Sequence, residues 1–150
     1  MEFPYLKQVS SIEETIHIAE RFSRCLKGGE VIVLNGSLGT GKTFFIKNVL
    51  KKLGVSEVSS PTFTLINEYA GKFNIYHFDF YRINKPGELI DIGYYDYFNG
   101  KGAVFIEWGN LFPEMLPKER FEVTMAFLPE SDAAFNEYDS SRLISIKKYE

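Results

Sequence analysis

An eight-residue segment, residues 36–43, has the residue types and the spacing of a phosphate-binding loop. It reads Gly-Ser-Leu-Gly-Thr-Gly-Lys-Thr and matches the pattern G-x-x-x-x-G-K-[ST] at every fixed position. Glycines let the backbone curl so that successive N–H groups point at phosphate oxygens. Lys42 then supplies a mobile positive charge for the β- and γ-phosphates, and the Thr43 hydroxyl is placed to ligate Mg²⁺. The predicted phosphate-binding residues are Leu38, Gly39, Thr40, Gly41, Lys42 and Thr43.

A plain glycine-rich turn is the alternative interpretation of this segment. At average residue frequencies the four fixed positions match by chance about once in 25,000 starting points, and so below roughly 1% of the time over a chain of this length. We therefore expect a bound nucleotide. ATP is favoured over GTP, because guanine-specific proteins usually carry Asn-Lys-x-Asp, and the nearest match, residues 84–87, reads Asn-Lys-Pro-Gly.

Two acidic residues directly follow apolar runs that predict strands. Glu107 follows residues 104–106, and Asp79 follows residues 75–78. Phosphate-loop proteins place a carboxylate at such a strand end to hold Mg²⁺ directly or through water. Either residue could instead cap a strand end in solvent, and the pattern alone leaves that alternative open. In an extended strand His77, Asp79 and Tyr81 would share one face, which favours a polar site there.

A third motif, residues 60–64, reads Ser-Pro-Thr-Phe-Thr and follows the loop's helix after a short polar stretch. A Pro-Thr pair in that place is similar to the switch I loop of GTPases, where a Thr senses the γ-phosphate and Mg²⁺. We interpret Thr62 as a candidate for such a sensor. A simple loop that leads into a strand is the alternative.

The elements around the phosphate loop predict its position in an α/β fold. Residues 31–34 form a continuous apolar run, which is typical of a buried strand in a parallel sheet. A helix is expected from residue 42 to residue 53, with Gly54 as its C-terminal stop. The helix would point the positive end of its dipole at the bound phosphates.

The rest of the chain predicts one earlier helix, a hairpin and three later strands. The earlier helix spans residues 11–27, with Ser11 and Glu14 at capping-box spacing. Strands are expected at 63–69, 73–80, 103–106, 121–128 and 143–147, with a short helix over 86–90 and a surface excursion at 135–141. These elements predict a single domain over residues 1–150, a P-loop NTPase-like three-layer α/β fold with a largely parallel, mixed central sheet.

Composition narrows the function classes. The 150 residues are 45% hydrophobic, which is enough for one globular core. A net charge of −3 gives no basic surface of the kind that binds nucleic acid directly. Cys25 is the only cysteine, so no internal disulfide is possible. The first residues lack a signal-peptide pattern and no apolar run could span a bilayer, so we expect a cytoplasmic protein without a membrane partner.

Together these motifs resemble the TsaE (YjeE) family. The resemblance is carried by residues 36–43, by 60–69, by His-Phe-Asp-Phe-Tyr-Arg at 77–82 and by Ile-Glu-Trp at 106–108. Proteins of that family are bacterial ATPases required to form threonylcarbamoyladenosine at the tRNA adenosine beside the anticodon, and they act with TsaD and TsaB. The resemblance implies ATP and Mg²⁺ as cofactors, a weak ATPase activity that depends on TsaD–TsaB partners, and tRNA contact only through those partners.

The resemblance also implies roles for individual residues. Lys42 and its loop bind the phosphates, Thr43 and Glu107 hold Mg²⁺, Asp79 is a Walker-B-like acid needed for metal or hydrolysis, and Trp108 lies near the nucleotide. Lys42, Asp79 and Glu107 are thus the candidate catalytic residues. The sequence departs from the family pattern at Ser37, where Asp is frequent, and at Gly109, where Pro is frequent. Neither is a fixed position of the phosphate loop.

Two other functions compete with this interpretation. A small-metabolite kinase would share the loop and the size, but such kinases usually add a lid whose arginines close over the transferred phosphoryl group. The chain has five arginines and none pair up in a lid-like segment: Arg21, Arg24, Arg82, Arg120 and Arg142. A nucleotide-dependent binding switch without useful hydrolysis is the other alternative, and turnover measurements separate it from an ATPase.

Overall fold

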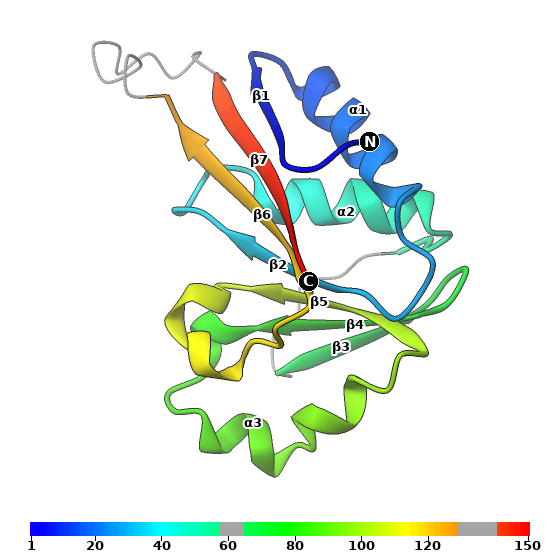
Figure 1. The fold of residues 1–150 in the computed structure, drawn as a ribbon, viewed down its shortest axis with the longest axis vertical. Helices are drawn as coiled ribbons and strands as arrows, with labels where there is room; N and C mark the ends of the chain where they lie inside the picture. The colour runs from blue at the N-terminus through cyan, green and yellow to red at the C-terminus, as the bar shows by residue number, and fades with distance from the viewer. Residues whose placement is uncertain (58–64, 129–140) are drawn as a thin grey trace.

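A mixed β-sheet forms the centre of the molecule (Figure 1). The computed structural model describes residues 1–57, 65–128 and 141–150, and within them the sheet has seven strands in the order β1-β7-β6-β2-β5-β4-β3. The strands are β1 (Tyr5–Val9), β2 (Val31–Asn35), β3 (Ile66–Ala70), β4 (Asn74–Asp79), β5 (Gly102–Glu107), β6 (Arg120–Phe127) and β7 (Arg142–Tyr149). Strands β6, β2, β5 and β4 run parallel, whereas β7, β1 and β3 are antiparallel to their neighbours.

Helices and short turns cover the two faces of this sheet. Helices α1 (Ile12–Ser23) and α2 (Lys42–Lys52) pack on one face, around buried residues such as Phe22, Phe45 and Phe105. Helix α3 (Gly87–Asp91) lies on the other face with four 3-10 helices, η1 (Phe80–Arg82), η2 (Tyr94–Tyr97), η3 (Gly109–Leu111) and η4 (Pro113–Met115). Phe78 and Tyr94 belong to the buried cluster on that face. The predicted three-layer α/β fold with a largely parallel, mixed sheet is therefore confirmed.

Strands β2 and β5 occupy the middle of the sheet because their sequences are apolar on both faces. Four of the five residues of β2 and all six of β5 are buried. Alternate residues of β5 divide between the two cores: Phe105 faces α1 and α2, and Ile106 faces α3. The next residue, Glu107, therefore points to the α2 side at the carboxyl end of the strand.

Helix α1 begins where the capping pattern predicts. The Ser11 hydroxyl accepts a hydrogen bond from the Glu14 N–H at 3.2 Å, which satisfies one of the free donors of the first turn. The helix ends at Ser23 and not at residue 27, so the predicted end was wrong by a turn. The Ser23 hydroxyl donates to the Glu20 carbonyl at 2.7 Å, a local bond that competes with the regular helical ladder.

Other boundaries differ from the predictions in ways that have physical reasons. Strand β1 was not predicted, because this edge strand is mostly exposed and lacks an apolar alternation. The face predicted for His77, Asp79 and Tyr81 ends at Asp79, because Tyr81 belongs to the 3-10 helix η1. Residues 60–64, which include Thr62, lie outside the described residues, as do 135–140 of the predicted surface excursion.

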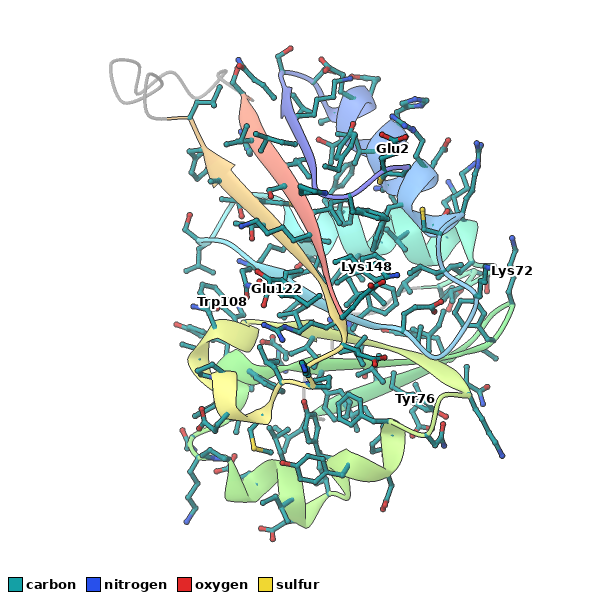
Figure 2. The ribbon with its side chains drawn as sticks, in the orientation of Figure 1. Glu2, Lys72, Tyr76, Trp108, Glu122 and Lys148 are labelled. Atoms are coloured by element: carbon teal, nitrogen blue, oxygen red, sulfur yellow. The ribbon has the colours of Figure 1, made fainter. Side chains whose placement is uncertain are left out.

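The carboxyl ends of the parallel strands meet at one edge of the molecule. In Figure 2 Trp108, which directly follows β5, lies at the left of the view, and Lys72, in the turn before β4, lies at the right. Ligands of open parallel sheets bind at the carboxyl edge. None of the helices within the described ranges is long and apolar enough to cross a membrane.

Candidate functional site

The phosphate loop joins β2 to α2 at this carboxyl edge, in the strand–loop–helix context that the sequence predicted. Three of its glycines, Gly36, Gly39 and Gly41, have positive φ angles of 151°, 79° and 101°. At Gly36 an added Cβ would lie 2.4 Å from the Met125 carbonyl oxygen, so a larger residue would push the loop away from β6. Gly41 is the N-cap of α2 and offers no side-chain cap, which leaves the first N–H groups of the helix available to an anion.

Lys42 lies inside the loop and not in solvent, with only 6% of its surface exposed. Its ammonium donates hydrogen bonds to the carbonyl oxygens of Gly36 and Ser37, and it sits 4.0 Å from the centre of the Trp108 ring. Burial lowers the pKa of Lys42, and the nearby Glu107 and Asp79 carboxylates oppose that shift. The loop thus holds a cation at the point where phosphate oxygens would arrive.

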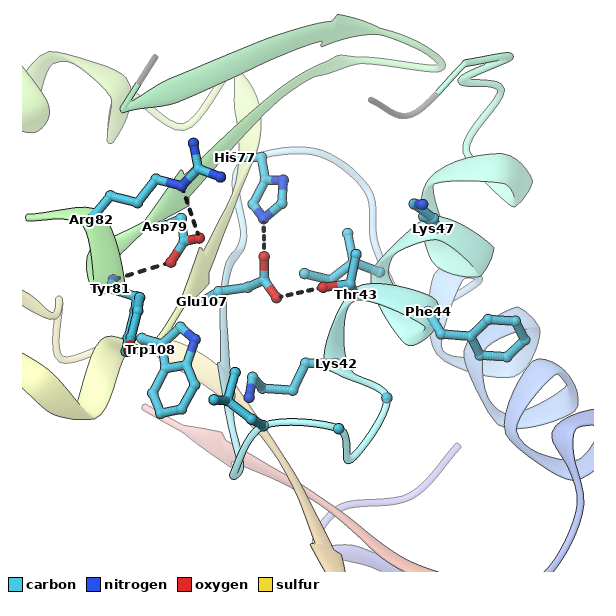
Figure 3. A pocket seen from close by; sticks show the side chains of 14 residues that line it. Lys42, Thr43, Phe44, Lys47, His77, Asp79, Tyr81, Arg82, Glu107 and Trp108 are labelled. Carbon is cyan, nitrogen blue, oxygen red and sulfur yellow. Dashed lines mark hydrogen bonds and ion pairs between the residues drawn. The ribbon is translucent and has the colours of Figure 1, made fainter. Parts of the chain in front are cut away.

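A chain of three side chains crosses from α2 to β4 (Figure 3). The Thr43 hydroxyl donates to Glu107 Oε1 at 3.2 Å, and Glu107 Oε2 lies 2.9 Å from Nε2 of His77. Burial alone would raise the pKa of Glu107, but the contacts with His77 and Thr43 and the charge of Lys42 lower it below its ordinary value. Glu107 is therefore ionised at neutral pH and available to a cation.

Asp79 lies beside Glu107 in the sheet register but has different partners. Its carboxylate accepts the Tyr81 N–H at 3.1 Å and lies 3.7 Å from Nε of Arg82. Burial and the neighbouring Glu107 raise the pKa of Asp79, while Tyr81, His77 and Arg82 pull it down. The structure thus separates the two candidate acids, since only Glu107 touches Thr43.

Trp108 closes the site from the η3 side. It is the only non-glycine residue with positive φ in the part of the chain that the structure describes, at 60°, and this turn brings its ring over Lys42. The Tyr81 ring lies 5.2 Å from the Trp108 ring. A non-glycine residue in this backbone region costs free energy, and such strain is concentrated at functional sites.

These groups surround a cavity of about 410 Å³. Eight of the nine predicted site residues line it: Leu38, Gly39, Gly41, Lys42, Thr43, Asp79, Glu107 and Trp108. The ninth, Thr40, turns its side chain into the loop, where the hydroxyl donates to the Ser37 carbonyl at 2.8 Å.

The sequence analysis assigned no role to His77, which contacts Glu107, or to Arg142, which contacts the loop. The sequence analysis placed His77 on the same face of a predicted strand as Asp79. That alternation of side chains along β4 is the signal from which a contact between His77 and Glu107 could have been predicted. Arg142 gave no signal, because it belongs to β7; its Nε donates to the Thr40 carbonyl at 3.2 Å across 102 residues of chain. It braces the loop from the side opposite Glu107.

The donor set fits Mg²⁺ bound together with phosphates. Within the described ranges, no group of three or more His, Cys, Asp or Glu side chains could hold a metal by itself. Mg²⁺ usually takes one or two protein oxygens and fills the remaining positions with phosphates and water. The Glu107 carboxylate and the Thr43 hydroxyl are such oxygens, and they lie at the mouth of the loop.

The fold and the site together define an α/β protein with a glycine-rich strand–loop–helix arrangement at the carboxyl edge of the parallel strands of a mixed sheet. Residues 9–133 match the family described as "Threonylcarbamoyl adenosine biosynthesis protein TsaE". The chain belongs to this family, which acts in tRNA threonylcarbamoyladenosine biosynthesis.

Individual relatives agree with this assignment. The chain is 43% identical to the "tRNA threonylcarbamoyladenosine biosynthesis protein TsaE" of Bacillus subtilis over 115 residues, which cover 75% of this chain and 72% of the relative. It is 36% identical to the protein of the same description from Rickettsia typhi, over 93% of this chain and 92% of the relative. The solved structure described as "Crystal structure of Bacillus subtilus YdiB" superposes with a TM-score of 0.78 at 31% identity, covering 100% of this chain and 88% of the other.

Proposed function

We propose that this protein is an ATPase that binds ATP with Mg²⁺ and supports the threonylcarbamoyladenosine modification of tRNA beside the anticodon, together with TsaD–TsaB partners. One observation carries the proposal: the hydroxyl of Thr43 and the ionised carboxylate of Glu107 meet at 3.2 Å beside the loop that holds Lys42. A hydroxyl has one proton and two lone pairs, so Thr43 can donate to Glu107 and still offer a lone pair to a metal.

Each side chain has a distinct task in this proposal. The loop amides and Lys42 bind the phosphates, and Thr43 and Glu107 hold the metal. Bound Mg²⁺ neutralises charge that develops on the phosphate oxygens during transfer. Asp79, beside Glu107 but without contact to Thr43, lies where it can orient a water or a metal-bound water through its carboxylate.

Partners complete the site in this proposal. Among the described residues Arg82 is the only arginine that lines the cavity, and its Nε lies 3.7 Å from an oxygen of Asp79. Phosphoryl transfer commonly needs an additional cation, often supplied in trans. Exposed apolar side chains border the cavity, with Leu38 at 72% and Tyr81 at 62% exposed, and they suit a protein contact. The acidic chain meets tRNA through those partners, in the cytoplasm where tRNA is modified.

The test combines binding and turnover. ATP binding is measured by calorimetry with and without Mg²⁺, and hydrolysis is measured with and without TsaD and TsaB. We expect slow hydrolysis by the chain alone and a clear acceleration by the partners. Thr43→Val removes the hydroxyl at nearly constant volume and should abolish hydrolysis. Thr124→Val, on an exposed position of β6, is the matched control and should change nothing.

Three outcomes would revise the proposal. Fast hydrolysis that ignores the partners would overturn the partner-completed site. If Thr43→Val bound ATP and hydrolysed it at the full rate, the metal would have to be held by other residues. Phosphorylation of a small metabolite at the expense of ATP would favour the kinase alternative, although the described part of the cavity offers no pair of arginines for such a reaction.

A further inference from the structure

His77 contributes a buried imidazole to the site, and no step of the proposed function uses it. It lies on β4, two residues after Ile75, which is fully buried on the same side of the strand. The His77 side chain is itself buried, with 4% of its surface exposed. Its Nε2 lies 2.9 Å from Glu107 Oε2, and the close view shows the ring pointing at the carboxylate (Figure 3).

The contact determines which nitrogen of His77 carries the proton. A carboxylate can only accept hydrogen bonds, so Nε2 must be the donor. The second ring nitrogen, Nδ1, is buried and has no hydrogen-bond partner within the part of the chain that the structure describes. The contact with Glu107 thus requires a proton on Nε2.

His77 and Thr43 hold the Glu107 carboxylate from two sides. One oxygen accepts from the strand β4 through His77, and the other accepts from the helix α2 through Thr43. Two donors on different oxygens fix both the position and the plane of the carboxylate. Among the residues that the structure describes, the hydrogen bond from Thr43 is the other one to this carboxylate, and a single bond leaves the carboxylate free to rotate about it.

We propose that His77 is a positioning residue that fixes the Glu107 carboxylate in the orientation with which Glu107 and Thr43 hold Mg²⁺. The inference rests on the proposed Mg²⁺–nucleotide function and adds to it a residue that touches neither the metal nor the phosphates. Side chains that orient metal ligands typically change metal affinity or activity by about 10- to 100-fold when they are removed. A buried imidazole with a merely structural role would change stability alone.

The test measures how strongly Mg²⁺ tightens nucleotide binding. Calorimetry gives the Kd of a non-hydrolysable ATP analogue at a series of Mg²⁺ concentrations and in EDTA. In His77→Leu we expect the Kd in EDTA to stay within about twofold and the half-saturating Mg²⁺ concentration to rise by about tenfold or more. His77→Gln offers an amide N–H near the place of Nε2 and should recover most of this loss. Ile75→Val changes packing on the same face of β4 and should leave the Mg²⁺ dependence unchanged.

A second measurement needs no nucleotide. The ¹⁵N chemical shifts of the His77 ring should show a protonated Nε2. The opposite tautomer would overturn the inference, because Nε2 could not then donate to Glu107. An unchanged Mg²⁺ dependence in His77→Leu would overturn it as well, while leaving the proposed function in place. Failure of the unaltered chain to bind the nucleotide would overturn both.

Discussion

Two cavities lie at opposite ends of the parallel strands. The one at the carboxyl ends measures about 410 Å³ and contains the phosphate loop. The one at the amino ends measures about 580 Å³ and is lined by the turns at Gly29 and Gly100, by Phe98 and by the end of β7 at Tyr149. The larger cavity is therefore not the one with the predicted chemistry.

The polar groups explain the difference between the two cavities. At the amino-end cavity both basic side chains have acidic partners: Arg120 pairs with Glu122 at 2.7 Å, and Lys148 pairs with Glu150. At the carboxyl end, Lys42 and Glu107 are buried and both point into the cavity. Buried charge that converges on a cavity indicates a functional site, whereas volume does not.

The largest expected effect comes from Lys42. Lys42→Ala should weaken ATP binding by about 10- to 100-fold, because a hydrogen-bonded charge on a phosphate contributes about 1.5–3 kcal/mol and each 1.4 kcal/mol is tenfold. Lys47→Ala is the matched control, since Lys47 also lines the cavity from α2 but is exposed. Arg120→Ala, in the amino-end cavity, should have no effect. Calorimetry checks all three, and an equal loss in Arg120→Ala would contradict the contrast between the cavities.

The two acids of the carboxyl-end cavity give the next effect. Glu107→Gln should lower ATP turnover by about 100-fold and weaken the Mg²⁺ dependence of nucleotide binding, because a neutral amide is a poorer ligand for the metal. Asp79→Asn should lower turnover as well but leave the Mg²⁺ dependence intact, since Asp79 does not touch Thr43. Steady-state hydrolysis and calorimetry at several Mg²⁺ concentrations distinguish them. Equal Mg²⁺ dependence in both variants would mean that the acids share the metal.

The sequence predicted the parts of this site that depend on local rules. The glycines of the loop, the dipole-bearing start of α2 and the apolar runs of β2 and β5 follow from residue types at fixed spacing. The apolar stretches of β4 and β5 stop at Asp79 and Glu107, and this predicts where the two strands end. The parallel pairing then brings the two acids together, because the carboxyl ends of parallel strands lie at one edge.

What the sequence left open depends on contacts between distant segments. Whether Asp79 or Glu107 meets Thr43 is decided by strand order and by the face to which each side chain points. The brace from Arg142 to Thr40 requires β7 to lie beyond β6, and no local pattern fixes that neighbour. The edge strand β1 lacks an apolar alternation, so it cannot be recognised before its partner β7 is known.

The Arg142 brace predicts a moderate effect. Arg142→Met keeps the aliphatic stem but loses the hydrogen bond to the loop carbonyl, and we expect about fivefold weaker ATP binding, the equivalent of about 1 kcal/mol. Arg24→Met removes the same charge at an exposed position near the end of α1 and is the control. Thermal unfolding is measured in parallel. A lower Tm with unchanged ATP affinity would show that Arg142 anchors only β7.

Substitution of Trp108 should change ATP affinity the least, and whether the affinity falls or rises shows what the ring does. The ring lies 4.0 Å from the Lys42 ammonium, and such contacts contribute about 0.5–1 kcal/mol where water has access. Trp108→Phe still places a non-glycine residue at the position with positive φ. It also keeps an aromatic ring beside Lys42, but a phenyl ring attracts the ammonium less strongly than an indole ring does. If the ring holds the Lys42 ammonium in the position in which it binds the phosphates, ATP binding in Trp108→Phe should weaken by about threefold. In that variant the Lys42 side chain is more mobile and loses more conformational entropy when ATP binds.

The opposite sign would mean that the ring competes with the phosphates for the ammonium. Tryptophan fluorescence separates the two cases, because Trp108 is the only tryptophan of the chain. We expect ATP to change its emission in the unaltered protein, and Lys42→Ala to change it before any nucleotide is added. Tyr81→Phe, which preserves the ring beside Trp108, should leave both responses in place. If neither ATP nor Lys42→Ala changed the Trp108 emission, the placement of the ring at the nucleotide site would be contradicted.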